Sequence, residues 1–512
     1  MKRILLASIW FALIAIAPAF SQDDPKSDKP DGPAPKGEVA TSKGSLHIDG
    51  KVLNYTIEAG TLQLRDEEND PIALFGFTAY FKDGVTDYSK RPIIFAYNGG
   101  PGSSSIWLHM GVMGPKRVAV NDVGYTPAAP YNLEENPNSP LDLADIVMID
   151  PVGTGLSHAI GKAKNTDFWG VDEDIRTVSL FIKQFVNEHN RWNAPKYLLG
   201  ESYGTMRNAG VMNYLQERLG MSLNGVIMVS AVFDIRMLAF SAGDDISYIT
   251  NLPTYAATAW YHDKVPGKPE LAKFLQDARD FAGGAYATAL MKGDQLQGGE
   301  RKEILTKLAY FTGLTEDYLS RADLRVRQGE FSQQLLRDQG ITVGRLDSRF
   351  TGINQDLLSQ NTQYDPQSAS ISPGYTAAFM DYFYNQLGVD KSNYYHVSAY
   401  ARKGFNWKWE HRSGRGFPSG STNTGVDMAE AMSHNPNLKV LIMNGYYDLA
   451  TPFYNVEYTI NHLGLTPEIK KNIEMKYYEA GHMMYTHEES LKMFKKDLAS
   501  FIDSTLHPVT QP

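Results

Sequence analysis

The sequence of 512 residues contains no cysteine, so it can form no disulfide bonds and cannot carry the lipid anchor of a bacterial lipoprotein. Its stability must therefore come from packing alone. A chain of several hundred residues can bury about three quarters of its unfolded surface, so such packing is sufficient.

Several other features are missing. Positive charge is in deficit, because the formal net charge is −9, and this argues against a nucleic-acid partner. No block of like charges suggests a binding tail, and nothing favours adhesion to an anionic membrane. No H-E-x-x-H or comparable ligand set appears, so we expect neither a metal nor another cofactor.

Long apolar runs are also absent, with one exception at the start of the chain. Residues 4–20 form an apolar run after Lys2 and Arg3, and small residues at the two positions that a signal peptidase reads end the run. We therefore predict a signal peptide over residues 1–21 and a secreted or periplasmic protein without a membrane anchor after cleavage. Residues 22–43, rich in proline and charge, are predicted to be a disordered spacer.

The next part of the chain has the pattern of an α/β protein. Alternating runs at 46–48, 52–57 and 73–81 predict opening antiparallel strands. Short apolar runs then alternate with helical periodicities such as 171–192, which indicates a mostly parallel sheet covered by helices on both faces. The predicted strands of this sheet are 93–97, 144–149, 197–199, 226–229, 440–443 and 473–478.

Some two hundred residues lie between the predicted strands 226–229 and 440–443, far more than a crossover connection needs. We therefore predict an inserted, largely helical cap domain over 234–436, with the core formed by 44–233 and 437–512.

A candidate nucleophile lies in Gly200-Glu201-Ser202-Tyr203-Gly204, directly after a predicted strand and before a predicted helix. A serine on such a tight turn presents its hydroxyl above the sheet edge, and glycines two residues away relieve the crowding. The pentapeptide alone is common, and its position between strand and helix favours catalysis.

A glycine-rich loop, Asn98 to Ser105, follows an earlier predicted strand. Acyl transfer places negative charge on the former carbonyl oxygen, which two backbone N–H groups usually stabilise. Tyr203, after the nucleophile, and Gly100, in the loop, are the candidates for this oxyanion hole. A simple Gly-Pro turn is the alternative for the loop alone.

With these motifs in order, the chain resembles the serine carboxypeptidase family of α/β-hydrolases. The matching segments are Asn-Gly-Gly-Pro-Gly at 98–102, Asp-Pro-Val-Gly-Thr-Gly at 150–155, Gly-Glu-Ser-Tyr at 200–203 and Ala-Gly-His-Met at 480–483. The resemblance implies an α/β-hydrolase fold with a cap, a Ser-Asp-His triad and exopeptidase activity on peptides. It also implies that Asn98, Gly99 and Glu201 bind the terminal carboxylate of the substrate.

In this fold the acid and the base follow the nucleophile in the chain. Asp448 comes shortly after a late strand, where a carboxylate can reach an imidazole, although a solvated turn aspartate is the alternative. Of the later histidines, His482 lies just past the last strand and is the predicted base, with His487 in reserve.

Two positions depart from the family pattern. The family's second glutamate is replaced by Val112, which puts terminal-carboxylate recognition in question; we expect this loss to raise the pKa of Glu201. Arg207, one helical turn beyond the nucleophile, is either a charge directed toward the pocket or an arginine that is ion-paired or at the surface.

The leading hypothesis is an exported serine exopeptidase that releases C-terminal residues. An esterase, an acyltransferase or an amino-end exopeptidase on the same fold is the alternative within the enzymes. A non-catalytic exported binding protein is the alternative from another class, and the complete set of Ser202, Asp448 and His482 argues against it.

Overall fold

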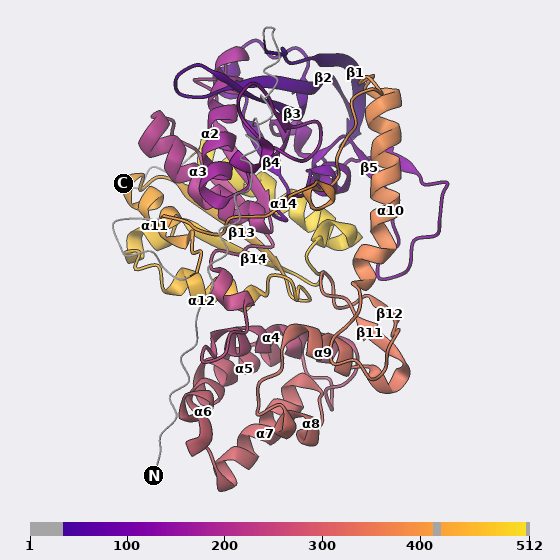
Figure 1. The fold of residues 1–512 in the computed structure, drawn as a ribbon, viewed down its shortest axis with the longest axis vertical. Helices are drawn as coiled ribbons and strands as arrows, with labels where there is room; N and C mark the ends of the chain where they lie inside the picture. The colour runs from indigo at the N-terminus through magenta and orange to yellow at the C-terminus, as the bar shows by residue number, and fades with distance from the viewer. Residues whose placement is uncertain (1–33, 413–420, 508–512) are drawn as a thin grey trace, which may run out of the picture. The chain divides into compact units, whose positions relative to one another are not determined.

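The computed structural model describes residues 34–412 and 421–507, which are built on a ten-stranded sheet (Figure 1). Nine strands follow one another along the sheet, and the two-residue strand β8 (His158–Ala159) pairs with β3. In spatial order these are β1 (Val39–Ile48), β2 (Lys51–Arg65), β3 (Pro71–Lys82), β7 (Asp145–Asp150), β4 (Ile93–Tyr97), β9 (Lys196–Glu201), β10 (Gly225–Val229), β13 (Lys439–Gly445) and β14 (Ile473–Tyr478).

The first three strands are antiparallel, and the six from β7 to β14 are parallel. Alternate side chains of the parallel strands enter two separate hydrophobic clusters. In β4, Ile94 and Ala96 face one cluster, whereas Ile93, Phe95 and Tyr97 face the other. Both faces are therefore buried at the centre of the sheet, which is why inner strands such as β4 and β10 are apolar, whereas the edge strand β14 is more polar.

Helices cover each face. One cluster contains side chains of α10 (Pro366–Asp381) and α14 (Glu488–Leu506), and the other contains side chains of α2 (Val171–Glu188), α3 (Tyr203–Leu219), α11 (Gly425–His434) and α12 (Phe453–Asn461). In α2 the buried residues recur every three or four positions, as the sequence predicted. The predicted mostly parallel sheet with both faces covered is confirmed, including the antiparallel opening strands.

A third cluster is formed mostly by the long segment between β10 and β13, joined by Tyr447 and Leu449 from the loop after β13. Its helices, labelled in Figure 1, are α4 (Ile246–Tyr261), α5 (Leu271–Phe281), α6 (Ala287–Lys292), α7 (Gly298–Thr312), α8 (Glu316–Arg321) and α9 (Gln328–Gln334), followed by the small hairpin β11 (Ile341–Val343) and β12 (Thr351–Ile353). Later parts of the segment pack on the sheet instead, since Tyr375 and Phe379 of α10 belong to a cluster of the core. The boundaries at 234 and 436 stay a prediction.

The shorter elements are α1 (Ile106–Leu108), with a turn of π-helix over His109–Met113, the hairpin of β5 (Lys116–Val118) and β6 (Leu133–Glu135), and α13 (Pro467–Lys470). Strand β1 begins at Val39, within the predicted spacer of 22–43. The part of that spacer before residue 34, and the whole predicted signal peptide, lie outside the described residues.

Candidate functional site

Ser202 occupies a strained turn between β9, which ends at Glu201, and α3, which begins at Tyr203. Its backbone has φ 61° and ψ −129°, a region that residues other than glycine rarely adopt. Gly200 is required by packing, because a Cβ there would lie 2.2 Å from the carbonyl oxygen of Gly204. The turn therefore has the form that the motif predicted, with the serine side chain only partly buried.

Asp448 and His482 form a buried pair at the carboxyl ends of β13 and β14. His482 Nδ1 lies 2.7 Å from Asp448 Oδ2, and both side chains are almost fully buried. The carboxylate also accepts hydrogen bonds from the backbone N–H groups of Ala450 and Thr451 and from the Thr451 hydroxyl. These contacts fix the carboxylate so that it orients the imidazole through Nδ1, leaving Nε2 for proton transfer.

The backbone of His482 is anchored from both sides. Its carbonyl accepts a hydrogen bond from the Ser230 hydroxyl at 2.6 Å, and its N–H donates to the carbonyl of Leu346 at 2.6 Å. Burial lowers the pKa of the imidazole, but the Asp448 carboxylate more than offsets this, and the pKa is raised overall. His482 thus has the surroundings of a general base.

His487, the reserve candidate, has no contact with Asp448 in the described structure. Its Nδ1 lies 2.8 Å from the Ser490 hydroxyl, and its Nε2 lies 3.9 Å from Asp122.

No hydrogen bond joins Ser202 to His482 in residues 34–412 and 421–507. Glu201, next to Ser202, nevertheless lies close enough to His482 for their charges to interact. Catalytic hydrogen bonds often form fully only when substrate binds.

The glycine-rich loop lies against the turn that carries Ser202. A Cβ at Gly99 would lie 2.5 Å from the backbone nitrogen of Tyr203 and 2.6 Å from that of Gly204. Only glycine permits this approach, which brings the Gly99 backbone beside the Tyr203 amide. The assignment of Gly100 and Tyr203 as the oxyanion donors stays a prediction. The close packing of the loop against the turn is consistent with this assignment.

Asn98 and Glu201 are brought together, as the resemblance implied. The Asn98 side-chain amide donates to Glu201 Oε1 at 2.7 Å, while its oxygen accepts from the Leu108 N–H at 3.0 Å. Glu201 is 3% exposed, and burial raises its pKa to about 7. The sequence reasoning expected a raised pKa but for the wrong reason, because losing a neighbouring acid at Val112 would lower the pKa and burial is the cause.

Of the two alternatives for Arg207, the structure supports the ion-paired arginine, because the side chain is fully buried and pairs with a carboxylate. Its guanidinium lies 2.7 Å from Asp174 and donates to the carbonyl of Asn98 at 2.8 Å. It also lies over the rings of Tyr97 and Tyr203. Arg207 therefore ties the start of the glycine-rich loop to the helix behind the nucleophile.

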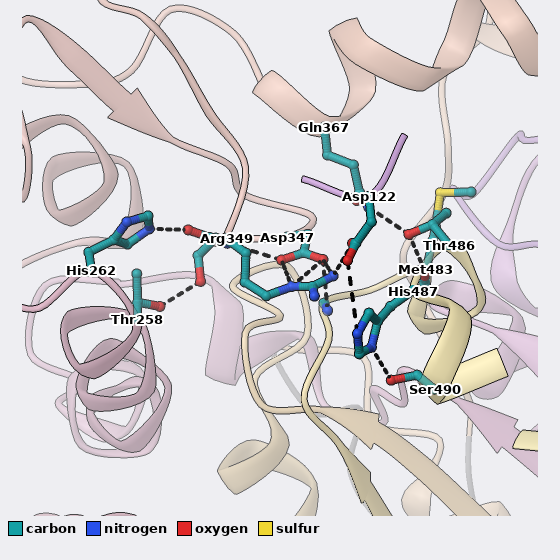
Figure 2. A network of polar contacts seen from close by, with 12 residues as sticks. Asp122, Thr258, His262, Asp347, Arg349, Gln367, Met483, Thr486, His487 and Ser490 are labelled. Carbon is teal, nitrogen blue, oxygen red and sulfur yellow. Dashed lines mark hydrogen bonds and ion pairs between the residues drawn. The ribbon is translucent and has the colours of Figure 1, made fainter. Parts of the chain in front are cut away.

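A charged cluster from the inserted segment holds the loop that carries His482 (Figure 2). Asp347 accepts a hydrogen bond from the Gly481 N–H at 3.0 Å, and Arg349 lies 2.7 Å from Asp347 and 3.2 Å from Asp122. The neighbouring Ser348 is bonded to Thr258 and His262 at the end of α4. We call Asp347 and Arg349 the clamp; sequence reasoning missed both, since no local pattern marks them.

The clamp leads to a stability prediction. Arg349→Met would leave the Asp347 carboxylate buried without its cation, and this is expected to lower the free energy of unfolding by about 3–5 kcal/mol. Urea denaturation of the purified protein measures the change. Combining it with Asp347→Asn, which removes the charge but keeps an acceptor for Gly481, should restore much of the loss.

A matched control for the clamp is Arg321→Met. Arg321 forms an ion pair with Asp317 at 2.6 Å, but both side chains are more than 70% exposed. Exposed pairs contribute little, so this variant should unfold nearly as the wild type does. Equal losses for Arg349→Met and Arg321→Met would contradict the role given to the clamp.

Within residues 34–412 and 421–507, no helix has the length and apolar character needed to cross a membrane. The same part of the chain holds no cluster of three or more histidine, aspartate or glutamate side chains arranged to bind a metal ion.

The chain is similar to known serine carboxypeptidases. The model of the serine carboxypeptidase family matches residues 56–495. A carboxypeptidase Y homolog A from Sclerotinia sclerotiorum is 29% identical over 211 residues, which are 36% of this chain and 36% of that protein. Carboxypeptidase Y from Candida albicans is 26% identical over 189 residues, which are 33% of this chain and 31% of that protein. These alignments thus span about a third of the length of each curated relative.

One solved structure shares the fold over most of its length. The crystal structure of Kex1(delta)p, a prohormone-processing carboxypeptidase from Saccharomyces cerevisiae, has a TM-score of 0.52 and 15% sequence identity. The match covers 88% of this chain and 91% of that chain. At this identity the likeness concerns the fold.

Proposed function

Because the chain belongs to the serine carboxypeptidase family, we propose that it releases the C-terminal residue of peptides through an acyl-enzyme intermediate. The observation that carries the proposal is the position of the Asn98–Glu201 pair, directly beside the candidate nucleophile Ser202. A pair of this kind is suited to recognise a carboxylate, and the Asp448–His482 pair supplies a base at the same sheet edge.

We infer the acylation step from the roles proposed for the three side chains. Ser202 Oγ attacks the carbonyl carbon of the last peptide bond while its proton passes to His482 Nε2, and the resulting imidazolium is stabilised by Asp448. The N–H groups of Gly100 and Tyr203 are proposed to receive the negative oxygen of the tetrahedral intermediate.

The intermediate then collapses in the usual way for this chemistry. The bond between the carbonyl carbon and the leaving nitrogen breaks, His482 gives its proton to that nitrogen, and the C-terminal amino acid departs. A water molecule, activated by His482 in turn, hydrolyses the ester on Ser202 and restores the enzyme.

Recognition of the substrate's end depends on the protonation state of Glu201. An ionised Glu201 would repel a substrate carboxylate, whereas a protonated Glu201 can donate a hydrogen bond to it. Because burial raises the Glu201 pKa to about 7, the protonated form is available in neutral and acidic solution. Asn98 then supplies a second donor at the same place.

Export is also part of the proposal. We propose that residues 1–21 are a cleaved signal peptide and that the mature protein is secreted or periplasmic, on the basis of the apolar run at residues 4–20. Mass spectrometry of the mature N-terminus after expression in a bacterial host with a secretion pathway tests this, and cleavage after Ser21 is the expected result.

An organophosphonate probe separates the proposed enzyme from a non-catalytic binding protein. The probe should label Ser202 in the wild type and leave Ser202→Ala unlabelled, as read from the modified tryptic peptide. Release of phenylalanine from an N-acylated dipeptide, absent in the same variant, then separates a peptidase from an esterase. Labelling elsewhere, or none at all, would contradict the proposed nucleophile.

A further inference from the structure

Glu201 has a free oxygen in a place closed to solvent. Its Oε1 accepts from Asn98, but its Oε2 has no hydrogen-bond partner within residues 34–412 and 421–507. A buried polar atom without a partner is unfavourable, so each one calls for an explanation such as strain, a catalytic role or a ligand that binds there. Val112, on the neighbouring π-helical turn, offers only an apolar side chain.

Tyr485 presents a second unpartnered group at the same place. Its side chain is 1% exposed, and its hydroxyl also has no hydrogen-bond partner among the described residues. The hydroxyl interacts with both Glu201 and Asn98, which locates it beside that pair. The hydroxyl and Oε2 lie close together without a well-formed hydrogen bond between them, so each has bonding capacity left for a substrate group.

The ring of Tyr485 is held in this orientation by Gly111. A Cβ at Gly111 would lie 2.3 Å from Tyr485 Cε2 and 3.1 Å from the Tyr375 hydroxyl, so only glycine leaves room for the ring. Tyr485 also lies three residues after His482, on the same loop.

We propose that the Tyr485 hydroxyl binds the terminal carboxylate of the substrate together with Asn98 and protonated Glu201. This rests on the proposed function and names a specificity-determining residue for it. Burial, followed by the nearby Glu201 charge, holds the pKa of the Tyr485 hydroxyl well above its usual value, so the group stays a neutral donor. Three donors then converge on one carboxylate: an amide, a carboxylic acid and a phenol.

Tyr485→Phe tests the proposal because it removes only the hydroxyl. The measured quantity is the ratio of kcat/KM for a peptide with a free C-terminal carboxylate to kcat/KM for its C-terminal amide. Since a hydrogen bond to a charged group contributes about 1.5–3 kcal/mol, the ratio should fall by about tenfold to a hundredfold, mainly through KM for the acid. Gly111→Ala, which displaces the ring, should lower the ratio in the same direction.

Tyr478→Phe is the matched control. Tyr478, at the end of β14, is also buried, and its hydroxyl donates to Asp497 at 2.7 Å. This variant should leave the ratio at the wild-type value. If Tyr485→Phe keeps the wild-type preference for acids, or lowers both substrates equally, the role of Tyr485 is wrong while the proposed function stands. If the wild type itself shows no preference for acids, both the role and the proposed function fail.

Discussion

Ser202→Ala, Asp448→Asn and His482→Ala are each expected to lower kcat/KM for peptides by about 10⁴-fold to 10⁶-fold while the fold is retained. The three side chains act as one unit, so a second substitution adds little to the first. The physical reason is the buried contact of 2.7 Å between His482 and Asp448, without which the imidazole is neither oriented nor stabilised as it accepts the serine proton. Initial-rate kinetics on an N-acylated dipeptide measure the loss.

His487→Ala is the control for the choice of base. It lies on the same stretch of chain but contacts Ser490 and Asp122 instead of Asp448, so this variant should keep most of the activity. Circular dichroism and thermal unfolding of every variant separate lost chemistry from lost folding. A His482→Ala enzyme with near-normal activity, together with an inactive His487→Ala, would show that the base is assigned to the wrong histidine.

Peptide hydrolysis is expected to fall on both sides of an optimum pH, whereas ester hydrolysis falls only on the acid side. The alkaline decline belongs to Glu201: its pKa is about 7, so above this pH it ionises and repels the substrate carboxylate, and binding weakens about tenfold per pH unit. The acid decline belongs to His482, which must be neutral to act as a base and whose pKa is raised by Asp448.

The two groups influence each other, so the observed pKa values belong to the coupled pair. Glu201→Gln separates them, because an amide cannot ionise. In this variant the alkaline decline for peptide acids should disappear, while the acid decline remains. A C-terminal amide lacks the carboxylate that Glu201 repels, so its profile in the wild type should resemble that of the ester. Identical profiles for acid and amide, unchanged in Glu201→Gln, would show that Glu201 does not read a carboxylate.

Much of the candidate site could be predicted from the sequence because its residues lie just after predicted strands. Ser202 and Asp448 follow apolar runs that form β9 and β13, and His482 follows the more polar run of β14; parallel strands bring their carboxyl ends to one edge. The glycines at 99 and 200 marked close approaches of the backbone that the structure contains. Local sequence patterns sufficed to place these residues because each position depends on its own strand or turn.

Other features depended on contacts between distant parts of the chain. Asp347 contacts Gly481 across 134 positions, and Arg349 contacts Asp122 across 227, so no local pattern could join them. Residues 39–43 were assigned to the spacer because they contain few apolar residues, yet they pair with β2 at the edge of the sheet. An edge strand needs backbone pairing more than it needs apolar side chains.

The direction of peptide shortening tests the central claim most directly. One peptide is prepared free at both ends, acetylated at its amino end, and amidated at its carboxyl end, and each form is incubated with wild type and Ser202→Ala before mass spectrometry. We predict ladders that shorten from the carboxyl end for the free and acetylated forms at slightly acidic pH, slow shortening of the amidated form, and no ladder with Ser202→Ala. Shortening from the amino end that acetylation blocks, or equal shortening of the acid and the amide, would contradict the account.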